Sequence, residues 1–309
     1  MNIIDEYIRY LENLCGFAKG TLKQHLRICK LWADFLTSTR DKKLFKAEPI
    51  DLLDYIKFRQ KTGKVKNTTI SKELCVLRTF YAYLQDFEKI ELNPAASLPE
   101  LICEPPAEKK YLTVNECFDL LESIKTNTLI GLRDHTIMAL LWSTGLRNSE
   151  LCVLNRHDIN LREGSLIVRK GKGGKQRQVF FNNKMLEMLT HYWVMFPGDA
   201  DTPLFYAFSK NGSNKKKHAR LSQSRLVDIA GERSKAAGIS KKVNPLTFRH
   251  TFATHMYEAG VTMKDIKEML GHDDETETTV YVHISIDTAR KFLENHIANP
   301  ARYKDGGHK

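Results

Sequence analysis

The spacing of apolar residues predicts short helices over residues 1–92. Apolar positions recur there at intervals of three and four, the period that gathers side chains on one face of a helix. Segments 50–60 and 68–84 show the pattern, and the second carries a stripe composed of Val76, Leu77, Phe80, Tyr81 and Leu84. We expect that stripe to pack inside a helical core.

A break in the pattern near residues 100–111 marks a domain boundary. Pro99, Pro105 and Pro106 stand there among charged residues. Proline limits the continuation of a helix, and charged side chains keep a segment solvated. The length of 309 residues also agrees with two domains. We predict a helical domain at 1–100, a linker at 101–111, a second domain at 112–298 and a flexible polar tail at 299–309.

The second domain is predicted to be mainly helical with one β-hairpin. Residues 165–170 and 175–181 alternate apolar and polar side chains, and a glycine-rich turn separates them. Thr113 and Glu116 have the spacing of a capping box at the start of a helix. Gly271 follows a helical run, in the position of a left-handed C-terminal cap. The expected fold class is therefore mainly α with a small β-hairpin or sheet.

Charge and cysteine usage narrow the class of protein. The net charge is +11, and residues 105–309 contribute most of it, with 31 Lys+Arg against 23 Asp+Glu. Phosphate-rich partners are the usual reason for such a balance, and anionic membrane surfaces also fit. The six cysteines form no CxxC pair, so we expect reduced core residues and neither a zinc site nor a disulfide framework. The lack of a secretory pattern or long apolar run predicts a cytoplasmic or nucleoid location without membrane insertion.

Five side chains could together break a phosphodiester. The phenol of Tyr281 could attack phosphorus, and the guanidiniums of Arg147 and Arg249 could hold the charge that develops on the phosphoryl oxygens. Lys172, at the hairpin tip, could protonate a leaving oxygen. His272, directly after Gly271, could hydrogen-bond a phosphoryl oxygen.

Each candidate also has a simpler interpretation. Arg147 can form an ion pair with Glu150, three residues on, and both roles can hold together. Lys172 can be a solvated turn lysine, and His272 can cap a helix. Further candidate DNA contacts flank the hairpin tip or lie in a loop rich in glycine, asparagine and serine: Lys175, Arg177, Lys215, Lys216 and Lys217. His250 and His255 do not have the spacing of a metal site.

Five motifs in order make the chain resemble a known family. They are Thr-Gly-Leu-Arg at 144–147, Gly-Lys-Gly at 171–173, Arg-His-Thr-Phe at 249–252, Leu-Gly-His at 270–272 and Thr-Val-Tyr-Val-His at 279–283. Together they resemble the tyrosine recombinase (phage integrase) family, most closely its Xer and mobile-element integrase branches. The resemblance implies a two-domain C-shaped DNA clamp with a helical, SAM-like core-binding domain and a mixed α/β catalytic domain.

The resemblance also implies roles and partners. Tyr281 would form a 3′-phosphotyrosyl link, Arg147 and Arg249 would stabilise the pentacoordinate phosphorus, Lys172 would be the general acid and His272 a hydrogen-bonding assistant. No metal or cofactor is implied. The partner would be double-stranded DNA with an inverted-repeat core site, bound by a homotetramer. The sequence leaves open whether another protein activates the enzyme, and whether segment 287–297 docks within its own domain or into a neighbouring protomer.

One residue departs from the family pattern. The family usually has a histidine three residues before the second arginine, and this chain has Leu246. Leucine cannot transfer a proton. Three explanations are open: water or His272 compensates for the missing histidine, the enzyme is slow, or the chain is a variant altered to trap an intermediate. The leading hypothesis is a site-specific recombinase for integration and excision of a mobile element or for resolution of DNA dimers. The alternatives are a type IB topoisomerase and a DNA-binding accessory protein with a weakened site.

Overall fold

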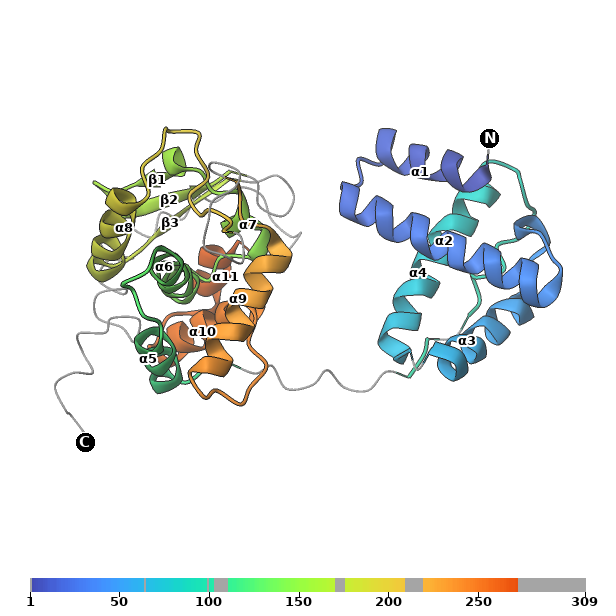
Figure 1. Ribbon diagram of the computed structural model, residues 1–309. Helices are drawn as coiled ribbons and strands as arrows, with labels where there is room; N and C mark the ends of the chain where they lie inside the picture. The colour runs from blue at the N-terminus through green and yellow to red at the C-terminus, as the bar shows by residue number, and fades with distance from the viewer. Residues whose placement is uncertain are drawn as a thin grey trace. The chain divides into compact units, whose positions relative to one another are not determined.

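The computed structural model describes residues 2–63, 65–98, 100–102, 111–169, 176–208 and 219–271. The chain divides into two compact units, unit 1 (Met1–Ala107) and unit 2 (Glu108–Lys309) (Figure 1). The expected linker coincides mostly with residues 103–110, which lie outside the described residues.

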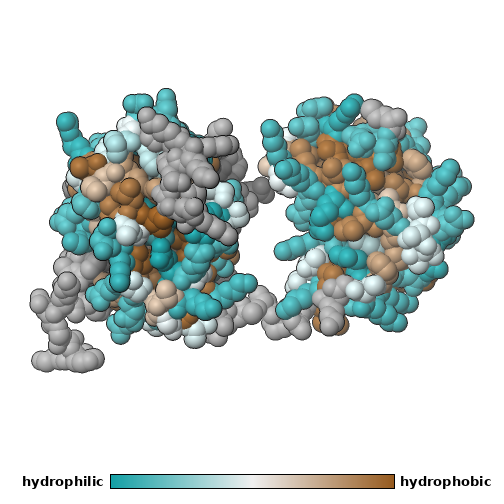
Figure 2. Space-filling model, viewed as in Figure 1, coloured by the Kyte–Doolittle hydropathy of each residue, from teal (hydrophilic) through white to brown (hydrophobic). Residues whose placement is uncertain are grey.

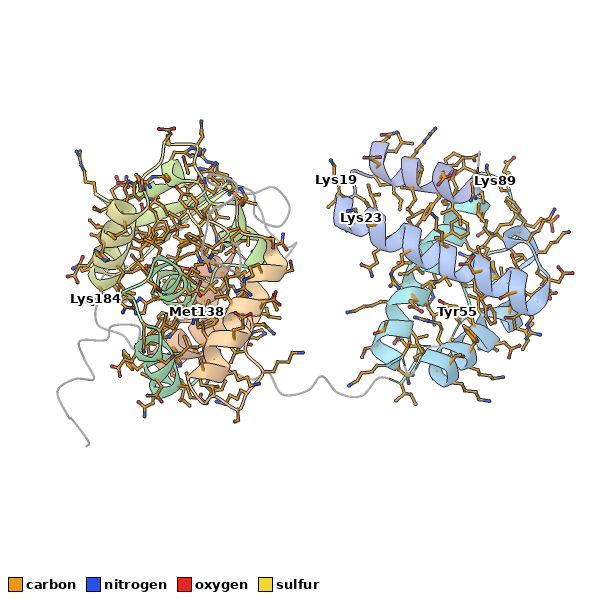
Figure 3. The ribbon with its side chains drawn as sticks, viewed as in Figure 1. Lys19, Lys23, Tyr55, Lys89, Met138 and Lys184 are labelled. Atoms are coloured by element: carbon orange, nitrogen blue, oxygen red, sulfur yellow. The ribbon has the colours of Figure 1, made fainter. Side chains whose placement is uncertain are left out.

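Unit 1 is a group of helices around an aromatic core. Its elements are α1 (Ile3–Asn13), α2 (Lys19–Arg40), the short 3₁₀ helix η1 (Leu44–Lys46), α3 (Pro49–Gly63) and α4 (Asn67–Asp86). The predicted stripe of α4 is buried along its length, which confirms the helical core. Trp32 donates a 2.7 Å hydrogen bond to the Tyr81 hydroxyl inside it. Figure 3 shows Tyr55 among these helices, with Lys19, Lys23 and Lys89 at the periphery.

The cysteines follow the expectation only in part. Cys29, Cys117 and Cys152 are buried and reduced, as predicted. Cys15 and Cys75 are exposed, so the expectation of a core position is wrong for them. Cys15 lies beyond the end of α1, and Cys75 points away from the side of α4 that carries the buried stripe.

Unit 2 is built around one buried helix. Its helices are α5 (Val114–Ser123), α6 (Leu129–Thr144), α7 (Asn148–Val153), the 3₁₀ helix η2 (Arg156–Asp158), α8 (Asn183–Met195), α9 (Gln223–Ala236), α10 (Pro245–Glu258) and α11 (Met263–Leu270). Almost every residue of α6 from Gly131 onward is buried, because α5, α8 and α10 pack around it. Met138 is seen at this position in Figure 3. Because α6 is buried on nearly every side, it is the central helix of unit 2, on which α5, α8 and α10 pack.

A small antiparallel sheet flanks these helices. Strands β1 (Ile159–Asn160), β2 (Ser165–Val168) and β3 (Arg177–Phe180) lie in the order β1-β2-β3. Leu166 pairs with Val179, and both are buried, so one face of the sheet packs on the core. The predicted hairpin is confirmed as β2–β3, with β1 as a strand that the alternation did not reveal. Figure 2 shows polar residues over much of the viewed surface.

The local signals at helix ends are confirmed. The Thr113 hydroxyl accepts from the Glu116 amide at 3.2 Å, and the Glu116 carboxylate accepts from the Thr113 amide at 2.7 Å, which completes the capping box. Gly271 ends α11 with a left-handed φ of 62°. These ends matter because two of the candidate residues, Arg147 and Arg249, contact the end of α11.

Candidate active site

Arg147 is positioned by the turn between α6 and α7. Gly145 caps α6 with a left-handed φ of 61°, a conformation that glycine adopts without strain. A Cβ on Gly145 would lie 2.7 Å from a Leu270 methyl carbon and 2.8 Å from the Phe252 ring. Glycine therefore lets the turn press against α10 and α11, and it places Arg147 at the N-cap of α7.

Arg249 approaches the same turn from α10. The side chain of Asn244 caps the start of α10 by accepting from the Leu246 and Thr247 amides at 2.9 and 3.1 Å. Arg249, one turn into the helix, is 4% exposed. It donates to the Gly145 carbonyl at 2.9 Å and to the Leu270 carbonyl at 2.6 Å. The fold thus brings together two arginines that stand about a hundred residues apart in the sequence.

Glu150 is the carboxylate at the centre of this site. Its Oε2 accepts from the Arg147 backbone N–H and its Oε1 from the Arg147 guanidinium, both at 2.8 Å. The predicted ion pair between Arg147 and Glu150 is therefore confirmed. Arg147 also donates to the Gly271 carbonyl at 2.8 Å. The carboxylate fixes the arginine at both its backbone and its side chain.

Arg177, the first residue of β3, completes the cluster. Its two terminal nitrogens each donate to one oxygen of Glu150 at 2.8 Å, which is a bidentate ion pair. Sequence reasoning missed this pairing and treated Arg177 only as a candidate DNA contact. A signal for it did exist. Arg177 shares a strand face with the buried Val179, and a charge on a buried face needs a partner.

The electrostatics follow from this crowding. Burial alone would raise the pKa of Glu150, but the hydrogen bonds from Arg177 and the Arg147 amide lower it to about 2. Burial lowers the pKa of the Arg249 guanidinium to about 10, and repulsion from Arg147 and Arg177 adds to the effect. Glu150 and Arg249 are therefore both charged at neutral pH. Three guanidiniums around one carboxylate leave a surplus of positive charge that can hold an anion.

The end of α11 is pressed against this arginine cluster. The carbonyl oxygens of Leu270 and Gly271 accept from Arg249 and Arg147. Such terminal carbonyls have no partner within their helix and carry the negative end of its dipole, so they favour a cation. A Cβ on Gly271 would meet the Arg177 side chain at 3.1 Å, so a larger residue would push the guanidinium aside. The next residue in the chain after Gly271 is His272.

Comparison with known proteins agrees with this geometry. Residues 110–287 match the model of the phage integrase family, and residues 4–86 match that of the phage integrase N-terminal SAM-like domain. The chain belongs to the phage integrase family of tyrosine recombinases. Its activity is that of a tyrosine-type site-specific recombinase.

Relatives of this recombinase align over most of their length. XerC of Syntrophus aciditrophicus is 30% identical over 302 residues, covering 92% of this chain and 93% of the relative. XerC of Thermodesulfovibrio yellowstonii is 34% identical over 249 residues, covering 78% and 79%. XerD of Staphylococcus saprophyticus is 30% identical over 296 residues, covering 94% and 96%. All three are tyrosine recombinases by name.

Solved structures share the fold. A lambda integrase dimer bound to a COC′ core site matches with a TM-score of 0.68 at 18% identity, covering 92% of this chain and 98% of that one. The Tn1549 transposon integrase in complex with a circular intermediate DNA matches with a TM-score of 0.64 at 18% identity, covering 96% and 99%. These likenesses confirm the expected fold class of two-domain tyrosine recombinases.

Several candidate residues of the recombinase lie outside the described residues. They are Lys172 and Lys175 at the hairpin tip, Lys215, Lys216 and Lys217 in the loop before α9, and His272 and Tyr281 after α11. Among the residues predicted from sequence, the structure therefore brings together Arg147, Arg249 and Arg177, and it shows that Glu150, the expected partner of Arg147, is shared by Arg147 and Arg177.

Leu246 lies on the first turn of α10, three residues before Arg249. Its side chain is 58% exposed, so it contributes little to the core. A histidine could stand at this position without displacing buried neighbours. His255, on the same helix, is buried instead: it accepts from Trp142 at 3.2 Å and contacts the Leu112 carbonyl at 3.0 Å. Burial lowers the pKa of His255, which favours its neutral form, and its hydrogen bonds join α10 to α6 and to the segment before α5.

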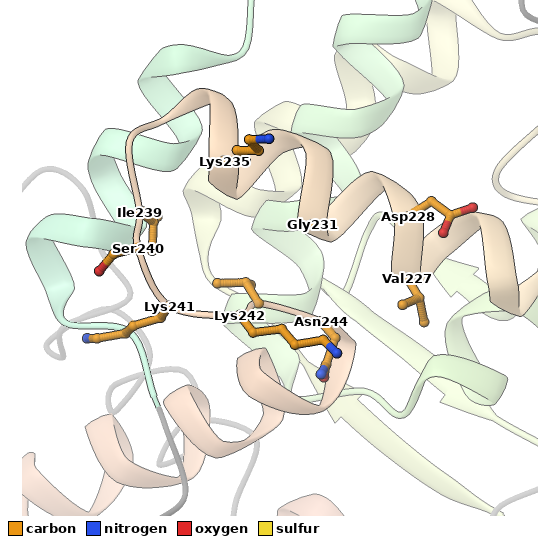
Figure 4. Close-up of a pocket in the computed structure, with 10 residues that line it drawn as sticks. Val227, Asp228, Gly231, Lys235, Ile239, Ser240, Lys241, Lys242 and Asn244 are labelled. Atoms are coloured by element: carbon orange, nitrogen blue, oxygen red, sulfur yellow. The ribbon is translucent and has the colours of Figure 1, made fainter.

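A separate hollow of about 720 Å³ lies between α9 and the loop that leads to α10 (Figure 4). Its lining includes three lysines, Lys235, Lys241 and Lys242, but Lys241 is already paired with Glu116 at 2.6 Å. None of the arginines of the cluster lines it. In the described ranges no group of three or more metal-ligating side chains is found, and no helix there is long and apolar enough to cross a membrane.

Proposed function

We propose that this recombinase cleaves and rejoins double-stranded DNA through a 3′-phosphotyrosyl intermediate at Tyr281. The observation that carries the proposal is the convergence of Arg147 and Arg249 on the end of α11. Tyr281 follows Gly271 by ten residues in the sequence, and an extended chain of that length spans roughly 33 Å. The tyrosine can therefore reach a phosphate held by the two arginines.

The proposed reaction conserves phosphodiester bonds. The phenol of Tyr281 gives its proton to solvent, and its oxygen attacks phosphorus as the bond to the 5′-oxygen breaks. Lys172 gives the 5′-oxygen a proton and is itself reprotonated from solvent. Arg147 and Arg249 hold the charge that gathers on the two non-bridging oxygens, and His272 donates a further hydrogen bond. A 5′-hydroxyl then attacks the phosphotyrosine and regenerates the phenol. Each step exchanges one ester for another, so no external energy source is required.

The proposed partner is a core site of inverted repeats, bound by a homotetramer. The relatives named XerC and XerD and the DNA-bound lambda integrase dimer support a DNA substrate and assembly on it. The surplus positive charge of unit 2 supports binding to phosphate, with Lys175 and Lys215, Lys216 and Lys217 as proposed backbone contacts. The biological role would be integration and excision of a mobile element or the resolution of DNA dimers.

A nicked suicide duplex tests the chemistry. The cognate repeat would first be found by selecting bound genomic fragments, and the covalent protein–DNA band would then be measured on denaturing gels. Wild type should give a band that Tyr281→Phe abolishes while DNA binding is retained. Specific binding without any band would instead favour the accessory-protein alternative, which Leu246 supports.

Recombination and relaxation assays then separate the remaining enzyme classes. A recombinase should exchange two core sites and depend on their repeats. A type IB topoisomerase would relax supercoiled plasmid that lacks the repeat at the same rate as plasmid that carries it. Lys172→Ala should slow cleavage of an ordinary 5′-oxygen much more than cleavage at a 5′-bridging phosphorothiolate, whose sulfur leaves without a proton.

A further inference from the structure

We propose that Arg177 is a positioning residue of the cleavage site, because it neutralises Glu150 and so leaves the charge of Arg147 available to the scissile phosphate. The inference rests on the proposed function, and it assigns Arg177 a role different from direct contact with DNA. Its basis is the set of hydrogen bonds on the Glu150 carboxylate and the packing of Arg177 against α11.

The hydrogen bonds on Glu150 show how Arg147 and Arg177 share the two carboxylate oxygens. Arg177 takes one oxygen with each terminal nitrogen, so it fixes the plane of the carboxylate. Arg147 takes Oε1 with its guanidinium and Oε2 with its backbone N–H. Each oxygen thus receives one bond from each arginine. The Glu150 side chain is 2% exposed, so water cannot substitute for a missing donor.

The charge count explains why a second arginine is needed. A carboxylate beside a phosphate-binding arginine orients that arginine but also cancels its charge. With Arg177 in place, three guanidiniums face one carboxylate, and the net charge is +2. Without Arg177 the net charge falls to +1, and the freed lone pairs of Glu150 draw Arg147 toward the carboxylate. The approaching phosphate then meets a weaker and misdirected cation.

The packing of Arg177 leaves little of it for DNA. Its side chain is 14% exposed, and its guanidinium lies so near Gly271 that a Cβ there would be 3.1 Å from its Nη1. Its buried Nε makes no hydrogen bond in the described part of the chain. Arg177 stands at the start of β3, five residues after Lys172 in the sequence, so the same ion pair ties the β2–β3 hairpin to the arginine cluster.

A charge-removal cycle on the full-length protein tests the assignment. Single-turnover cleavage of the suicide duplex would be measured at saturating protein for Arg177→Gln, Glu150→Gln and the double variant. Arg177→Gln should slow cleavage at least about 10-fold. The double variant should be faster than Arg177→Gln, because it removes the carboxylate that Arg177 neutralised. A double variant as slow as Arg177→Gln, or slower, overturns the proposal.

Two matched variants guard against a trivial loss of folding. Arg233→Gln removes an arginine from another buried carboxylate shared by two arginines, that of Asp134, and cleavage per folded molecule should remain unchanged. Arg177→Lys retains the charge and should lose less activity than Arg177→Gln. If Arg177→Gln does not fold, the cleavage rates of Arg177→Lys and of Arg177→Lys with Glu150→Gln are compared instead. Lysine still neutralises Glu150, so adding Glu150→Gln should not raise the cleavage rate. A higher rate would overturn the assignment.

Salt-dependent DNA binding gives a readout that does not require cleavage. A direct phosphate contact at Arg177 would lower the slope of log affinity against log salt by about one in Arg177→Gln. The positioning role predicts an unchanged slope, and a loss of about one overturns it. Wild-type protein without a Tyr281-dependent adduct would refute the proposed function, whereas this slope would still decide between the two roles of Arg177.

Discussion

The described part of unit 2 contains two buried carboxylates that are each shared by two arginines, and they differ in what surrounds them. Asp134 binds Arg133 through one oxygen and Arg233 through the other, with distances from 2.6 to 2.9 Å. Glu150 is also shared by two arginines, but each of its oxygens accepts one bond from Arg147 and one from Arg177. The Asp134 cluster joins α6 to α9, whereas the Glu150 cluster joins α7, β3 and the end of α11.

The difference lies in how the remaining donors are used. Arg133 is 2% exposed, donates to the Tyr206 carbonyl at 2.9 Å and lies 5.0 Å from the centre of the Phe208 ring. Its charge is enclosed by protein. The Glu150 cluster adds a third cation, Arg249, and the Arg147 side chain is 24% exposed. Both clusters have a partly exposed arginine, because the Arg233 side chain is 31% exposed. They differ in charge: two arginines share Asp134, whereas three surround Glu150, and the larger positive surplus is suited to an incoming anion.

Breaking the Asp134 cluster should have the largest effect on stability. Asp134→Asn would remove the charge of a buried carboxylate and leave the buried Arg133 without its ion pair, so the free energy of unfolding should fall by about 3–5 kcal/mol. Cleavage per folded molecule should not change. Denaturant unfolding measures the first quantity, and Glu232→Gln, which breaks the exposed pair with Arg225, is the control with little effect. A selective loss of cleavage in folded Asp134→Asn would contradict the distinction between the clusters.

Weakening the Glu150 cluster should mainly lower the rate of DNA cleavage. Arg249→Lys retains a charge but loses the planar fork, and single-turnover cleavage should fall by about 10²–10³-fold, or 2.7–4 kcal/mol. Arg133→Lys makes the same change in the Asp134 cluster and should leave cleavage of the folded protein within a few-fold of wild type. Equal rate losses in the two variants would show that both clusters act only through the fold.

Low pH should lower the free energy of unfolding by protonating Glu150. Its pKa falls from an ordinary 4.5 to about 2 on folding, so its contribution is fully present above pH 4.5 and is lost as pH falls toward 2. The shift corresponds to about 3 kcal/mol. The difference in unfolding free energy between wild type and Glu150→Gln should therefore shrink over that window. A difference that stays constant from pH 6 to pH 2.5 would contradict the assignment.

The sequence predicted what depends on short spacings. The stripe of α4, the capping box at Thr113 and the pairing of Arg147 with Glu150 all involve neighbours on one helix, and all are present. The bonds from Arg177 to Glu150 and from Arg233 to Asp134 bridge 27 and 99 residues. Those pairings depend on how a strand and a helix pack against α7 and α6, which no local pattern determines.

A substitution at Leu246 should have the smallest effect on stability, because the position is exposed and can change the cleavage rate without disturbing the core. The side chain is 58% exposed on the first turn of α10, so Leu246→His should change the free energy of unfolding by no more than about 0.5 kcal/mol. It adds a group able to transfer a proton one turn before Arg249, and single-turnover cleavage should rise, by up to about 10²-fold. Leu246→Gln, polar but unable to act as an acid or base near neutral pH, should bring no such gain. If Leu246→His cleaves no faster than wild type, the leucine is not a chemical deficit and the site is complete without an imidazole there.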